Sequence, residues 1–128
     1  MKKLLILLLA VLLCPFAMAE ETPLLEVHQM ALGFADGYLI RLGDIAIANN
    51  PFELYLHYGQ IIKARSHARQ TFLIQLSVGA DVHAGYLPSP EGERLGGYGG
   101  LIINGQVGSA GGYKLADDTV AAINAFFD

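Results

Sequence analysis

The sequence has one cysteine, Cys14, and lacks the common catalytic signatures. Cys14 lies in an apolar N-terminal stretch that we predict is removed, so the mature chain would form no disulfide and offer no thiolate. There is no His-Glu-x-x-His metal motif and no Gly-x-Ser-x-Gly nucleophile motif. Ser109 is a conceivable nucleophile, but no general base lies near it in the sequence. These absences favour a protein that is not an enzyme.

The N-terminus has the three parts of a secretory signal. Lys2 and Lys3 form a positive region, residues 4–13 form an unbroken apolar core, and Ala17-Met18-Ala19 supplies the small residues of a cleavage site. The apolar run is shorter than the roughly 20 residues that span a bilayer, which argues against the alternative of an uncleaved anchor. We therefore predict a signal peptide over residues 1–19 and a periplasmic or secreted protein.

Positive charge is scarce in the remainder of the chain. The sequence has 8 basic and 12 acidic residues, and the loss of Lys2 and Lys3 leaves 6 basic residues and a net charge of −6. Nucleic acids and anionic membranes both attract clusters of positive charge. We predict neither a nucleic-acid partner nor a membrane partner after signal cleavage. Residues 20–128 suit a single small domain without disulfides, for which a homo-oligomer would supply extra buried surface.

Apolar residues recur at helical spacing in three segments. The first is 22–42, where Thr22 and Pro23 resemble a helix start and His28 lies on an apolar stripe; the others are 60–76 and 115–127. Residues 79–97, rich in glycine and proline, are expected to be irregular.

Two hairpins are expected between these helices. Residues 44–48 and 53–58 are predicted strands joined by Asn49-Asn50-Pro51, which is typical of a turn. Residues 101–103 precede Asn104-Gly105, a dipeptide that favours a type I′ turn. The pattern therefore predicts an α+β fold, in which an antiparallel sheet of two hairpins is covered by three main helices.

The C-terminal half resembles the GlcG/HbpS family of haem-binding proteins. The resemblance rests on the turns and strands of 99–105, on Val107-Gly108, on Gly111-Gly112 and on the acidic pair Asp117-Asp118. Upstream, Lys63-Ala64 followed by Ala68 and Phe72 is similar to a helix of that family, and residues 45–58 would be its first hairpin. The resemblance implies a curved antiparallel sheet with helices, assembled as a homo-oligomer.

The resemblance implies an exported binding protein for haem or a related tetrapyrrole. Haem requires an apolar slot, an axial donor and cations near its propionates. His28 is the first choice as axial ligand and His67 the second, with Arg65 and Arg69 as candidate propionate partners, although a solvated helix face also accounts for these arginines. The alternative is a non-enzymatic interaction protein that acts through an oligomeric surface and binds no cofactor.

Overall fold

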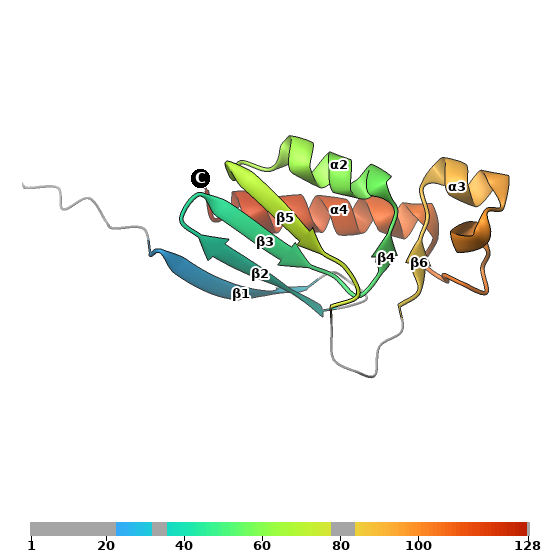
Figure 1. Cartoon of the computed structure of the whole chain (residues 1–128), viewed down its shortest axis with the longest axis horizontal. Helices are drawn as coiled ribbons and strands as arrows, with labels where there is room; N and C mark the ends of the chain where they lie inside the picture. Colours follow the sequence, from blue (N-terminus) through green and yellow to red (C-terminus); the bar gives the residue numbers. More distant parts are fainter. Residues whose placement is uncertain (1–22, 32–35, 78–83, 128) are drawn as a thin grey trace, which may run out of the picture.

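The computed structural model describes residues 23–31, 36–77 and 84–127 (Figure 1). The predicted signal peptide lies outside these residues, so it and the exported location stay predictions. The described chain has an α+β fold, as predicted, with a mainly antiparallel sheet and three α-helices. The elements are β1 (Leu25–Ala31), β2 (Asp36–Leu42), β3 (Ile45–Asn49), β4 (Glu53–Leu54), α2 (Leu56–Arg65), β5 (Gln70–Ile74), β6 (Tyr86–Leu87), α3 (Pro90–Leu95), the 3₁₀ turn η1 (Tyr98–Gly100) and α4 (Gly108–Asn124).

The main sheet has four strands in the order β1-β2-β3-β5. β1 and β2 are antiparallel, as are β2 and β3, whereas β3 and β5 are parallel because α2 crosses over between them. A two-residue turn joins β2 to β3, since Leu42 pairs with Ile45 across Gly43-Asp44. Gly43 has a φ of +57°, which a glycine at the first position of such a turn adopts without strain. β4 and β6 form a short parallel pair beside this sheet.

Both long helices lie on one side of the main sheet (Figure 1). α4 contacts β1 and β3, α2 contacts β5, and the two helices pack against each other. The core between the helices and the sheet consists of fully buried apolar side chains. They include Leu39, Ala46 and Ala48 from the sheet, Tyr58 and Ile62 from α2, and Leu115, Ala116, Val120 and Ile123 from α4.

The prediction of a helix over residues 22–42 is wrong. Within that segment the described residues form the hairpin partners β1 and β2. The strand predicted over 53–58 is too long, because only Glu53–Leu54 forms a strand and α2 begins at Leu56. The helix predicted over 60–76 ends at Arg65, where Lys63 and Arg65 favourably face the negative end of the helix dipole, and the chain returns as β5.

The second predicted hairpin is absent from the described chain. Residues 102–104 form a turn, and the Asn104 carbonyl accepts a hydrogen bond from the Tyr86 amide at 2.8 Å. Gly105 permits this close approach, because a Cβ there would overlap the Tyr86 carbonyl. The last helix, predicted over 115–127, begins earlier and spans Gly108–Asn124.

A short helix, α3, lies within the segment that we expected to be irregular. Its start has a standard cap: Pro90 is the first residue and the Ser89 hydroxyl accepts the Gly92 amide at 3.2 Å. Gly96 ends it with a φ of +66°. Within the described ranges, none of the helices combines the length and apolar character needed to cross a membrane.

Candidate functional site

His28, the first choice as axial ligand, lies on strand β1 and not on a helix. Its ring packs edge-on against Phe126, with 4.3 Å between centroids, and its Nε2 is 3.7 Å from a carboxylate oxygen of Glu26. The side chain is 56% exposed. The environment is therefore an edge strand beside the end of α4, and not the apolar helix stripe that the sequence predicted.

The other predicted ligand residues flank the loop between α2 and β5. The Arg65 side chain forms an ion pair with Asp117 on α4, and the His67 amide donates to the Asn124 side chain at 2.9 Å. Asn124 also donates to the Arg65 carbonyl, so both residues lie beside the last turn of α4. Arg69 donates its backbone amide to the Asp44 carbonyl at 2.9 Å.

The end of α4 therefore gathers three of the four predicted residues. Arg65 and His67 contact Asn124, and His28 contacts Phe126 two residues further on, whereas Arg69 lies at the edge of the sheet. Over the described part of the chain, no three His, Cys, Asp or Glu side chains are grouped so that they could hold a metal ion.

A second cluster joins α2 to the start of α4 through aromatic side chains. His57 Nε2 lies 3.0 Å from the Tyr113 hydroxyl, and the rings of His57, Tyr58 and Tyr113 meet edge to face. The buried Tyr58 hydroxyl donates to the Pro88 carbonyl at 2.7 Å and lies 3.0 Å from the Ser109 carbonyl. Burial, with smaller effects of Tyr113 and Glu93, raises the pKa of Tyr58 to about 12. Tyr58 is thus neutral at physiological pH and fixes neighbouring backbone.

Ser109 is hydrogen-bonded to Glu93 on α3, a pairing that the sequence did not predict. The Ser109 amide donates to Glu93 Oε2 at 3.0 Å. Hydrogen bonds from the Ser109 hydroxyl and then from its amide lower the pKa of Glu93. A carboxylate with a lowered pKa is a weak base, and its place at the first turn of α4 is that of a helix cap. This pair therefore stabilises the start of α4.

The most extensive feature is the side of the main sheet that faces away from α2 and α4. We call it the open sheet face. Strand register places its residues, because directly paired residues project to the same side and alternate residues along a strand share a side. Its members are Leu25, Val27 and Gln29 on β1, Tyr38, Ile40 and Leu42 on β2, Ile45, Ile47 and Asn49 on β3, and Gln70, Phe72 and Ile74 on β5.

None of these twelve residues is Asp, Glu, Lys, Arg or His, and nine are apolar or tyrosine. Six of the nine are between 42% and 60% exposed: Leu25, Val27, Tyr38, Leu42, Phe72 and Ile74. An antiparallel sheet with one solvated face normally alternates apolar inward residues with polar outward ones. Here the outward residues are apolar as well, so the side of the sheet away from the helices carries a contiguous apolar patch.

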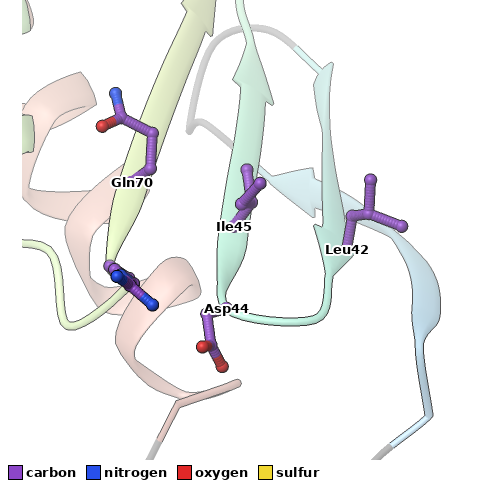
Figure 2. A pocket seen from close by; sticks show the side chains of 5 residues that line it. Leu42, Asp44, Ile45 and Gln70 are labelled. Carbon is purple, nitrogen blue, oxygen red and sulfur yellow. The ribbon is translucent and has the colours of Figure 1, made fainter.

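A depression lies at one end of the open sheet face, where β2, β3 and β5 meet the Gly43-Asp44 turn. Leu42, Ile45 and Gln70 lie on three neighbouring strands, with Asp44 at the turn below them (Figure 2). These residues and Arg69 line a depression of about 420 Å³ that opens widely to solvent. It extends the open sheet face and brings one carboxylate and one guanidinium to its margin.

We compared the chain with known proteins. No protein-family model matches it, no curated protein matches it in sequence, and no solved structure matches it. Membership of the GlcG/HbpS family therefore stays a prediction from the sequence.

Proposed function

We propose that this chain is a non-enzymatic interaction module that binds an apolar protein surface through the open sheet face. The row from Val27 on β1 to Phe72 on β5 carries the proposal. It crosses all four strands through paired residues and contains no polar side chain. Burying apolar surface is the main favourable contribution to protein association, so the binding of another protein layer over this row would be favourable.

The shape of the face favours a protein partner over a small molecule. Ligand sites are concave and enclose most of the ligand surface. The open sheet face is formed by four neighbouring strands, and its hollow lies at one margin, beside Leu42 and Gln70. A second sheet or a helix layer could cover all four strands, as in layered domains.

The positions of the histidines also bear on the tetrapyrrole prediction. Haem needs an axial donor beside an apolar slot. His28 follows Val27 along β1 and therefore projects to the opposite side of the sheet from the open sheet face. His67 lies in the loop after α2, beside the last turn of α4. The donors and the broad apolar surface are thus on different sides of the molecule.

We accordingly expect a haem titration of the full chain to give no saturable shift of the Soret band. A saturable band at about one haem per chain, lost in His28→Ala while circular dichroism shows an intact fold, would instead support the tetrapyrrole prediction. The same experiment with His67→Ala tests the second predicted donor.

Binding of 8-anilinonaphthalene-1-sulfonate, a dye that fluoresces at apolar surfaces, tests whether the open sheet face is an accessible apolar surface. The protein is diluted until it sediments as a monomer, so that no second copy covers the face. The matched variants are Ile74→Lys on the open sheet face and Ile102→Lys, whose side chain is exposed in the turn after η1. We expect the dye signal to fall in Ile74→Lys and to stay near wild type in Ile102→Lys. Equal signals in all three proteins would contradict the proposed function.

A further inference from the structure

We infer that the open sheet face is covered by a second copy of this chain, with the two sheets packed face to face. This inference rests on the proposed function and names the partner. Two sheets packed in this way lie about 10 Å apart and form a shared apolar layer. α2 and α4 would then form the outer layers, because both lie on the other side of the sheet (Figure 1).

Charge favours a second copy at this face. The sequence carries a net charge of −4, so two copies repel each other in most orientations. The twelve residues of the open sheet face include no Asp, Glu, Lys, Arg or His. Two copies can therefore meet here without burying a charge or bringing like charges together, both of which oppose association.

The distribution of polar groups resembles that of an interface. Gln29, Asn49 and Gln70 lie toward strand ends, around an apolar centre at Ile40 and Ile47. Protein interfaces commonly combine an apolar centre with a polar rim. The Asn49 side chain is already satisfied, because it accepts the Tyr38 amide and donates to Ser77. The side-chain amide of Asn49 would therefore keep its hydrogen-bond partners when the face is covered.

The area is sufficient for a specific dimer. Six large side chains on the face are each about half exposed. At roughly 150–200 Å² per large side chain they expose on the order of 500 Å² in each copy. Two copies would bury about 1,000 Å² from these six alone, which reaches the lower limit of about 1,000 Å² for a specific interface. The half-buried Ile40, Ile45 and Ile47 add to this area.

Sedimentation velocity over a range of concentrations tests the inference on the full chain. We expect wild type and Ile102→Lys to sediment as dimers. Ile74→Lys should raise the dissociation constant by about tenfold or more, because each dimer would bring two lysines into an apolar interface. Leu25→Lys, at the opposite edge of the sheet, serves as a second variant if circular dichroism shows that Ile74→Lys is unfolded.

The dye experiment separates failure of this inference from failure of the proposed function. If the wild type is a monomer at all concentrations and its dye signal is lost in Ile74→Lys, the dimer inference is overturned and the open sheet face remains a surface for another protein. If the wild type is a monomer and has the same dye signal as Ile74→Lys, both the dimer inference and the proposed function are overturned. A dimer that neither Ile74→Lys nor Leu25→Lys weakens would place the interface elsewhere and overturn the inference.

Discussion

Replacing Tyr58 by phenylalanine should destabilise the fold by roughly 1–3 kcal/mol, the cost of leaving a buried polar group without its partner. Tyr58 is 0% exposed, and its hydroxyl donates to the Pro88 carbonyl at 2.7 Å while it lies 3.0 Å from the Ser109 carbonyl. The substitution keeps the ring and removes the hydrogen bonds that join α2 to the segment before α3 and to the first turn of α4. Urea unfolding at pH 7, followed by circular dichroism, measures the difference.

The same hydroxyl should make stability fall at alkaline pH. Burial raises the pKa of Tyr58 from 10.0 to about 12. Below pH 10 the residue is protonated in both the folded and the unfolded state, and its contribution is fully present. Between pH 10 and 12 the unfolded state loses its proton first, so wild type should lose roughly 2–3 kcal/mol more than Tyr58→Phe across this interval.

Tyr113→Phe is the matched control for these measurements. Tyr113 is 41% exposed, and its hydroxyl contacts His57 at the surface. We expect its effect to stay within about 0.5 kcal/mol at pH 7, as is usual for exposed positions. If Tyr58→Phe were as mild as Tyr113→Phe, or if its stability followed that of wild type above pH 10, the structural role assigned to the Tyr58 hydroxyl would be refuted.

Two further predictions concern the packing and capping of α4. Gly112→Ala should lower the free energy of unfolding in urea by about 1–3 kcal/mol, because the added Cβ would overlap the Tyr58 ring. Gly97→Ala should leave it nearly unchanged, since no atom lies within 4 Å of a Cβ built at that position. Equal effects of the two substitutions would refute the close packing at Gly112. Glu93→Gln should lower stability at pH 7, because hydrogen bonds from Ser109 lower the pKa of Glu93 below its ordinary 4.5. A group with a lowered pKa stabilises the fold above its unfolded pKa and loses this effect as the pH falls. The gap between wild type and Glu93→Gln should therefore close in acid, and a gap that is constant from pH 7 to pH 3 would contradict the cap.

The open sheet face explains why the sequence misled the prediction for residues 22–42. A strand with one solvated face alternates apolar and polar residues. In β2, Leu39 points into the core, while Ile40 and Leu42 point to the open sheet face. Apolar residues on both sides remove the alternation and match helical spacing equally well. The Gly43-Asp44 pair between apolar segments was an available hairpin signal.

Other elements differed because tertiary packing outweighed local preference. Asn104-Gly105 suits a hairpin turn, yet Gly105 is needed where the chain passes the Tyr86 carbonyl. Gly112 is a poor helix former, but it lies inside α4 because Tyr58 packs against it. Neither contact can be read from nearby sequence. The C-terminal helix was predictable, since apolar periodicity determines it locally. The α+β class was predicted correctly, although the first helix and the second hairpin on which that prediction rested are not in the described structure.

Oxidative footprinting by hydroxyl radicals, at low and high protein concentration, tests the central claim most directly. If the open sheet face is covered in solution, Phe72 and Ile74 should become protected as concentration rises, while Ile102 keeps a constant rate of oxidation. Oxidation of Phe72 and Ile74 that is the same in a sample that sediments as a monomer and in one that sediments as a dimer would show that copies associate through another surface and would contradict the account.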